Sequence, residues 1–91
     1  METTRARIER ILRESLQPLH LEIEDESSRH AGHAGAASGG GHYRVLVVSA
    51  RFDGLATIDQ HRLVNEALGE MIGREVHALG IRTVPARSWK G

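Results

Sequence analysis

The stretch TIDQHRLVNEALGEMIGREVHAL, residues 57–79, contains the change of pattern on which the fold depends. Thr57, with Gln60 three positions later, matches the capping box that begins many helices. The apolar residues that follow have the spacing of one buried helical face: Leu63, Val64, Ala67, Leu68, Met71 and Ile72. Gly73 stands where a left-handed residue would end this helix. An alternating pattern then begins and places His77 at the start of a strand, which makes it our first candidate for a functional residue.

The first part of the chain predicts a helix followed by a strand. Thr3 or Thr4 can cap the helix, and Pro18 ends it. The apolar face of this helix consists of Ile8, Ile11, Leu12 and Leu16. Residues 19–24 then alternate, which predicts a strand with one face in solvent. Leu19, Leu21 and Ile23 are expected inside, and His20, Glu22 and Glu24 outside.

The rest of the chain completes the predicted sheet. The run YRVLVVS, residues 43–49, predicts a central strand buried on both faces. A turn at residues 51–54 leads to the helix after Thr57, and a right-handed crossover makes the strand at 76–84 parallel to the central one. A last helical turn after Pro85 returns Trp89 to the sheet. We therefore predict an α+β fold of order α-β-β-α-β with a short C-terminal helix, and helices on one face of a mixed three-stranded sheet.

Length and composition exclude several classes of protein. The 91 residues predict a single domain, residues 1–91. Lys and Arg together number 12 and so do Asp and Glu, so no global charge favours nucleic acid or an anionic membrane. The absence of cysteine excludes disulfides, and no apolar run reaches the ~20 residues of a membrane span. The N-terminus lacks the apolar segment of a signal peptide, so we expect a cytoplasmic protein.

Four histidines raise the question of a metal site. His30 and His33 lie in the Gly- and Ser-rich connection ESSRHAGHAGAASGGG, in which we expect a flexible loop at about 27–41. His42 closes that connection, and His77 begins the last strand. Imidazoles from a loop and a strand can bind zinc, copper or iron. No fixed-spacing signature such as HxxxH is present, so the residues leave two interpretations open: exposed histidines without a metal, or half a site that a partner completes.

Two other functions find less support in the residues. No nucleophile elbow or paired-carboxylate arrangement appears, so we do not expect an enzyme. A basic patch near the second helix could bind nucleic acid, although a solvated helix face is the simpler interpretation at zero net charge. The side chains of that patch would be Arg51, His61, Arg62 and Arg74.

An ordered set of short motifs resembles the BolA family. The set is Asp25-Glu26-Ser27, His30, Gly41-His42-Tyr43-Arg44-Val45, Val47-Val48-Ser49, Arg51-Phe52 with Gly54, His61-Arg62-Leu63-Val64 and Val76-His77-Ala78-Leu79. The amphipathic first helix and Trp89 also fit, so the resemblance covers nearly the whole chain. It implies the fold called class II KH-like, in agreement with the predicted order of elements.

The resemblance also implies a partner and a cofactor. Members of this family pair with monothiol glutaredoxins and share a [2Fe–2S] cluster, to which glutaredoxin and glutathione give thiolates and the BolA-like protein gives imidazole. The strand histidine corresponds to His77 and the loop histidine to His30. Between His30 and His42 the loop is longer than the usual family loop and lacks its proline, so His33 and His42 are additional candidate ligands. Mixed Cys/His ligation raises a cluster's potential relative to thiolates alone.

Our interpretation of the sequence is therefore a non-enzymatic adaptor that helps a monothiol glutaredoxin bind, sense or transfer a [2Fe–2S] cluster. The cluster is not expected to be required for folding. The alternative is a DNA-binding transcriptional regulator of morphology and stress response, a role described for some bacterial members, with weak binding to DNA. A third option is an interaction module without a metal. We expect no association with membranes, and a monomer or weak dimer when the chain is alone.

Overall fold

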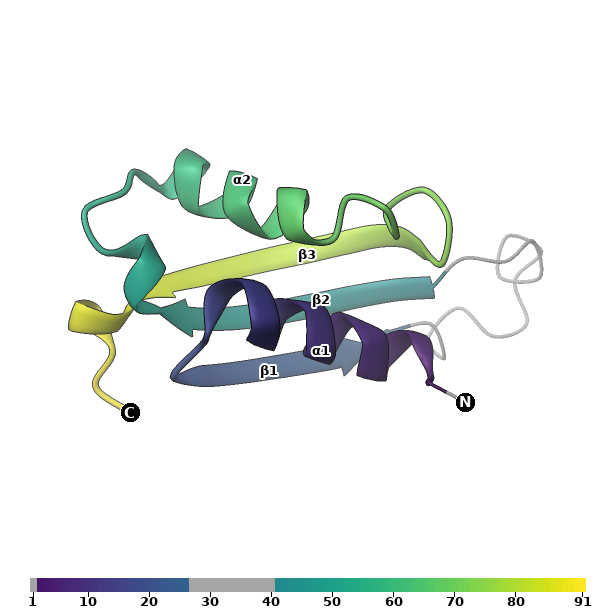
Figure 1. Ribbon diagram of the computed structural model, residues 1–91, viewed down its shortest axis with the longest axis horizontal. Coiled ribbons are helices and arrows are strands. Elements are labelled where there is room, and N and C mark those ends of the chain that lie inside the picture. Colours follow the sequence, from purple (N-terminus) through teal and green to yellow (C-terminus); the bar gives the residue numbers. More distant parts are fainter. Residues whose placement is uncertain (1, 27–40) are drawn as a thin grey trace.

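The computed structural model describes residues 2–26 and 41–91, which form a sheet with helices on one face (Figure 1). Almost all of the loop predicted at about 27–41, including His30 and His33, lies outside the described residues. The elements, with η for a 3₁₀ helix, are α1 Thr4–Leu16, β1 His20–Asp25, β2 Gly41–Ser49, η3 Ala50–Phe52, α2 Thr57–Ala67, β3 Val76–Pro85 and η4 Ala86–Ser88.

The sheet has β2 at its centre, in the order β1-β2-β3. β1 is antiparallel to β2, whereas β3 is parallel to it. A parallel pair needs a crossover between its strands, and α2 forms this crossover. The predicted α+β architecture, with its mixed three-stranded sheet and short C-terminal helix, is confirmed.

The core fills the space between the helices and one face of the sheet. Its apolar side chains are all at most 8% exposed: Ile8, Leu12, Leu16, Tyr43, Val45, Val47, Phe52, Val64, Leu68, Met71 and Val76. On the other face of β2, Arg44 is exposed and Leu46 is half-buried, although Val48 at the end of the strand is buried. The prediction that the central strand is buried on both faces is therefore wrong, because the helices cover only one of them.

The first helix begins as predicted. The Thr3 hydroxyl accepts a hydrogen bond from the backbone N–H of Ala6 at 3.0 Å and so satisfies one of the free donors of the first turn. α1 ends two residues before Pro18, which cannot continue it. Leu19, expected inside the sheet, is 67% exposed, because it precedes β1 and the inward row of that strand begins only at Leu21.

The second helix departs from the prediction at both ends. Its N-cap is Ala56, and no side chain caps it, so the predicted capping box of Thr57 and Gln60 does not form. Gln60 is only 5% exposed and uses its amide elsewhere: it donates to the Leu55 carbonyl at 2.8 Å and accepts from the Thr83 hydroxyl of β3 at 2.6 Å. The helix ends at residue 67, well before Gly73, although that glycine does have the predicted left-handed backbone with φ of 86°.

The Gln60 network makes a testable contribution to stability. Gln60→Ala leaves the Leu55 carbonyl and the Thr83 hydroxyl without these partners, so we expect the free energy of unfolding to fall by about 1–3 kcal/mol. Urea denaturation followed by circular dichroism measures this change. Thr57→Ala is the matched control and should change the same free energy by less than about 0.5 kcal/mol, because Thr57 does not cap the helix. Equal losses from the two substitutions would contradict this assignment.

Candidate functional site

The structure brings two of the four predicted histidines together. The centroids of the His42 and His77 rings lie 5.4 Å apart, with an angle of 39° between their planes. His42 is the second residue of β2 and His77 is the second residue of β3. His77 is exposed and His42 is half-buried. The two imidazoles therefore meet at the same end of two neighbouring strands.

A β-bulge determines where His77 points. Gly41 pairs with Val76, but the next residue, His42, pairs with Ala78, so β3 has one extra residue at position 77. Bulges are common beside functional sites because the extra residue leaves the regular alternation and its side chain takes a new direction. Val76 remains fully buried while His77 next to it is exposed. The bulge is thus the local feature that sets His77 beside His42 at the rim of the sheet.

Hydrogen bonds and an ion pair hold the segment before His77 in place. The Val76 N–H donates to the Met71 carbonyl at 3.0 Å, and the Gly73 N–H donates to the Val76 carbonyl at 2.8 Å. The left-handed backbone of Gly73 allows this tight turn. Arg7 of α1 forms an ion pair of 2.6 Å with Glu75, which links the first helix to the start of β3. Because the pair is partly exposed, it orients the segment more than it stabilises the fold.

Tyr43, the residue after the other histidine, belongs to the hydrophobic core. Its side chain is 8% exposed and follows His42 directly in β2. Burial is the main cause that raises the pKa of the Tyr43 phenol, and the carboxylate of Asp25 raises it further, while a hydrogen bond with Thr4 acts in the opposite direction. Tyr43 therefore stays protonated near neutral pH and acts here as a packing group.

Two imidazoles are not a complete metal site. Among residues 2–26 and 41–91, no group of three or more His, Cys, Asp or Glu side chains could hold a metal ion. The full sequence also has no cysteine. A pair of imidazole nitrogen donors at the rim of the sheet suits iron, copper or zinc only when another molecule supplies the remaining ligands. The donor set therefore fits half of a shared site.

All four candidate ligands were predicted from the sequence, but the pairing of His42 with His77 was not. The structure says nothing of His30 and His33, which remain candidates outside the described residues. The pairing could have been anticipated from two short motifs, Gly41-His42 and Val76-His77, which each begin a strand of one parallel pair. Parallel strands that start at the same edge place residues near their starts side by side. The sequence does not reveal the bulge, which shifts the pairing of β2 with β3 by one residue at His77.

A third histidine has a role that the alternation of β1 did not predict. His20 stacks on Trp89 with ring centroids 5.0 Å apart, and its Nε2 lies 2.6 Å from a carboxylate oxygen of Glu22. The predicted return of Trp89 to the sheet is thereby confirmed, and His20 is the residue that receives it. This cluster lies at the end of β1 that pairs with Val48, far along the sheet from His42. It anchors the C-terminal residues and does not belong to the histidine pair.

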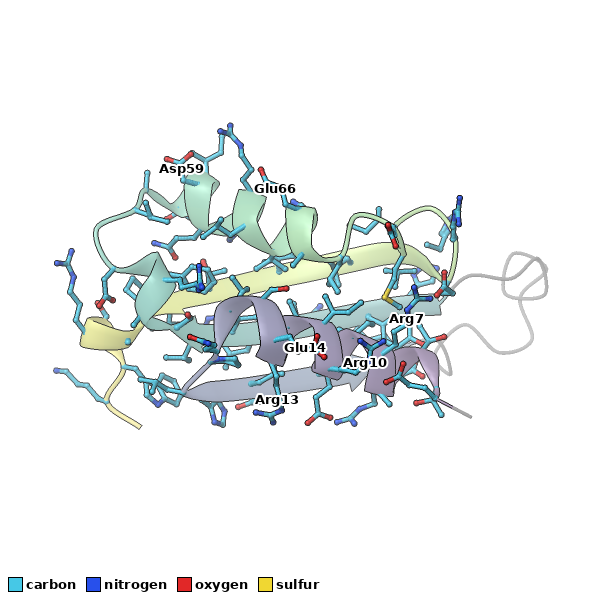
Figure 2. The ribbon with its side chains drawn as sticks, in the orientation of Figure 1. Arg7, Arg10, Arg13, Glu14, Asp59 and Glu66 are labelled. Carbon is cyan, nitrogen blue, oxygen red and sulfur yellow. The ribbon has the colours of Figure 1, made fainter. Side chains whose placement is uncertain are left out.

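The basic residues near α2 do not form one continuous patch. The segments that contain Arg51 and Arg74, η3 and the turn after α2, lie at opposite ends of the molecule (Figure 1). Arg62 lies 3.5 Å from Asp59, one turn away on the same helix. Asp59 and Glu66 both project from α2, while acidic and basic side chains are interspersed along α1 (Figure 2). The helical surface is therefore of mixed charge.

No helix in the described part of the chain is long and apolar enough to cross a membrane.

Comparison with known proteins identifies the family. The model of the family described as BolA-like protein matches residues 12–87. The protein named DNA-binding transcriptional regulator BolA from Escherichia coli is 41% identical over 87 residues, which cover 96% of this chain and 80% of that protein. Human BolA-like protein 1 is 44% identical over 79 residues, 87% of this chain but only 56% of that protein. The solved structure of BolA1 from Arabidopsis thaliana superposes with a TM-score of 0.85 at 34% identity and covers 99% of both chains. The chain belongs to the BolA-like family.

Proposed function

We propose that this protein is a non-enzymatic adaptor that joins a monothiol glutaredoxin to bind, sense or transfer a [2Fe–2S] cluster. The observation that carries the proposal is the pair of imidazoles at the rim of the sheet, half-buried His42 and exposed His77, with ring centroids 5.4 Å apart. His77 is the imidazole ligand in this proposal, because the bulge and the hydrogen-bonded turn before it fix its position. His42, His30 and His33 are the candidates for a second imidazole.

The residues present fit one side of such a cluster. Iron–sulfur clusters accept histidine in place of cysteine on one iron, and this replacement raises the reduction potential. The chain has no cysteine, so every thiolate must come from glutaredoxin and from glutathione. When bound, the cluster would supply one-electron redox chemistry or serve as cargo for an acceptor protein. The contribution of this chain is to present a pre-positioned imidazole to that shared centre.

The surface around His77 also suits a protein partner. His77 is exposed, so it can reach a ligand site that lies on another chain. Ile72, which bridges to Val76 beside it, is 39% exposed although it is a large apolar residue. The buried centre of a protein–protein contact is more apolar than the rest of the surface, so Ile72 beside His77 can pack against a docked partner. These two residues define where we expect the glutaredoxin to dock.

Co-expression with a monothiol glutaredoxin tests this function directly. The two proteins should co-purify as a coloured complex in the presence of glutathione, with visible absorption and circular dichroism that differ from those of the glutaredoxin alone. The matched control is the same preparation without this chain, in which only the all-thiolate spectrum should appear. If the two proteins do not associate, or if the spectrum of the cluster is unchanged by this chain, the proposal fails.

The second candidate function is regulation of transcription through DNA. It is favoured by the name of the Escherichia coli relative, which is 41% identical. The mixed charge of the helices and the separation of Arg51 from Arg74 provide few side chains for phosphate contacts. We therefore rank this function below the adaptor.

The weakness of DNA binding is a testable expectation. With roughly three phosphate contacts, the logarithm of the association constant should fall with the logarithm of the salt concentration at a slope of only about −3. Fluorescence anisotropy of a labelled duplex at several salt concentrations measures this slope. A sequence-specific complex with nanomolar affinity at physiological salt would reverse the ranking of the two functions.

A further inference from the structure

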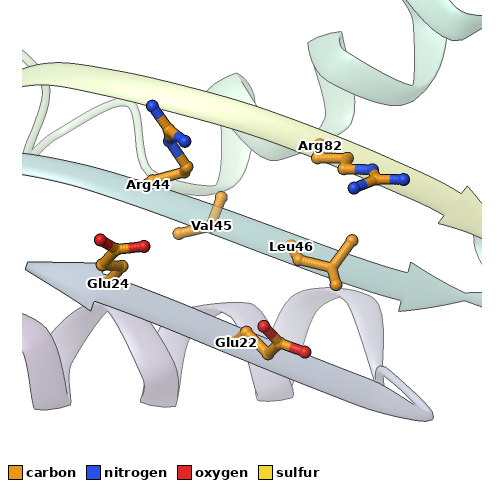
Figure 3. Close-up of a pocket in the computed structure, with 6 residues that line it drawn as sticks. All are labelled: Glu22, Glu24, Arg44, Val45, Leu46 and Arg82. Atoms are coloured by element: carbon orange, nitrogen blue, oxygen red, sulfur yellow. The ribbon is translucent and has the colours of Figure 1, made fainter.

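The face of the sheet that the helices leave uncovered has a charge pattern along its strands. Glu22 and Glu24 of β1 are exposed on this face, and so are Arg44 of β2 and Arg82 of β3. Together with Val45 and Leu46 they line a hollow of about 150 Å³ (Figure 3). The acidic side chains thus belong to one edge strand, and the basic ones belong to the centre and the other edge.

Arg44 leans from the central strand over β3. A Cβ atom at Gly80 would lie only 3.6 Å from Cγ and 3.7 Å from Nε of Arg44. Figure 3 shows the Arg44 side chain extending from β2 toward β3. One of its guanidinium nitrogens also lies 3.7 Å from a carboxylate oxygen of Glu26, an ion pair that leaves most of the side chain exposed. The basic groups therefore form a column over β3, opposite the acidic column on β1.

The strand register aligns these charges in rows. Glu22 pairs with Leu46, and Leu46 pairs with Arg82, so an acidic, an apolar and a basic side chain follow one another across the sheet. One row further, Glu24 pairs with Arg44, and Arg44 pairs with Gly80. Each row is acidic at the β1 side and basic at the β3 side.

We propose that this open sheet face is a self-association surface, on which a second copy of the chain docks by a twofold rotation about an axis along β2. This rotation places β1 of one copy over β3 of the other. Each row of one copy then lies over the same row of the other copy. Glu22 then faces the second copy's Arg82, and Leu46 faces Leu46 across the axis. A twofold axis perpendicular to the strands would instead place Glu22 and Glu24 over the same residues of the second copy, where like charges repel. The charge pattern therefore selects one of the two face-to-face arrangements.

The size of the face limits the strength of this dimer. Three strands spaced at about 4.8 Å, with six residues each at about 3.3 Å, cover roughly 300 Å² per copy. This is well below the area of about 800 Å² per partner in stable complexes, so the association should be weak and reversible. Its ion pairs are exposed to solvent at their edges, and salt should weaken it further. The dimer does not rest on the proposed cluster, because the histidine pair lies beyond these rows, at the ends of the strands.

Sedimentation equilibrium of the chain alone tests this surface. At low salt the weight-average mass should rise above 10.0 kDa as the concentration approaches about 1 mM, and 0.5 M salt should reverse the rise. Glu22→Arg and Arg82→Glu should each reduce the association constant about tenfold or more, because each creates two like-charge contacts. Glu66→Arg and Arg62→Glu are the matched controls on α2, with the same changes of net charge, and should associate like the unaltered chain.

Mixing the two charge variants separates the proposed arrangement from other modes of association. In a heterodimer of Glu22→Arg with Arg82→Glu, both charge contacts are attractive. The weight-average mass of the mixture should therefore rise with concentration as it does for the unaltered chain, although neither variant alone shows this rise. Because the chain has no cysteine, Leu46→Cys can also be linked to itself by a short bifunctional maleimide, whereas Ile58→Cys on α2, where the native isoleucine is 68% exposed, should not. A mass that does not depend on concentration would overturn the proposal. So would a Glu22→Arg variant that associates more strongly, or a mixture that remains monomeric.

Discussion

Replacement of His77 by alanine is expected to abolish the mixed Cys/His cluster complex with monothiol glutaredoxin and to leave the fold intact. The side chain is exposed, so its removal should change the free energy of unfolding by less than about 0.5 kcal/mol. Its position, however, is fixed by the bulge at position 77, opposite Gly41 and His42, and by the hydrogen bonds around Gly73. A ligand held in this way loses little entropy when it binds, so no other side chain replaces it at small cost.

Titration of each variant with cluster-loaded glutaredoxin, followed by visible circular dichroism and electron paramagnetic resonance, measures this loss. His61→Ala on α2 is the matched control, with the same chemical change at a site on the helix, and it should form the unaltered complex. A cluster complex of His77→Ala with the unaltered spectrum would show that the ligand assignment is wrong. Thermal unfolding of the same samples separates loss of the ligand from loss of the fold.

Each of the other three candidate ligands, His30, His33 and His42, should matter less than His77 when it is replaced alone. His42 lies beside His77 on a regular strand, so His42→Ala should alter the spectrum or weaken the complex. His30→Ala should also weaken or alter the spectrum, because the family resemblance assigns the loop ligand to this residue. His33 or His42 can take its place at modest cost, so only the combined replacement of His30, His33 and His42 should remove the second imidazole.

The sequence predicted the topology well because the hydrophobic patterns are strong and local. The alternation in β1, the apolar run of β2 and the four-residue spacing in α1 each fix one element, and short connections leave few ways to join them. The same reasoning was wrong where a residue serves a distant partner. Gln60 has the position of a capping residue, but its amide bonds to Thr83, which is 23 positions away. Local patterns carry no information about such a contact.

The candidate site was predicted as a set of residue types but not as a geometry. His77 stood out because a strand follows a helix at that point, and the family resemblance added His30. The proximity of His42 to His77 depends on how β2 and β3 pair. The pairing begins where the Gly41 N–H donates to the Glu75 carbonyl at 2.8 Å, and these two residues are 34 positions apart in the sequence. A slip of one residue in that register would separate the rings. Only the folded chain reveals the bulge that sets it.

The largest effect on stability is expected from Phe52, which the sequence placed in a turn. The side chain is fully buried, although it belongs to a 3₁₀ helix of three residues, η3, between β2 and α2. It is the only phenylalanine of the chain and one of the largest side chains in the core. The turn therefore contributes to the core directly, in addition to reversing the chain.

Phe52→Ala should lower the free energy of unfolding by about 3–5 kcal/mol, because it removes the transfer energy of the ring and leaves a cavity that the helices and the sheet can fill only in part. The whole free energy of unfolding of a small domain is only about 5–15 kcal/mol, so the variant should be close to unfolding at 37 °C. Urea denaturation at 25 °C measures the loss. Leu55→Ala, three residues away at a side chain that is 38% exposed, is the control and should cost much less. If Phe52→Ala lowers the free energy of unfolding by less than about 1 kcal/mol, the η3 turn is not part of the core in solution.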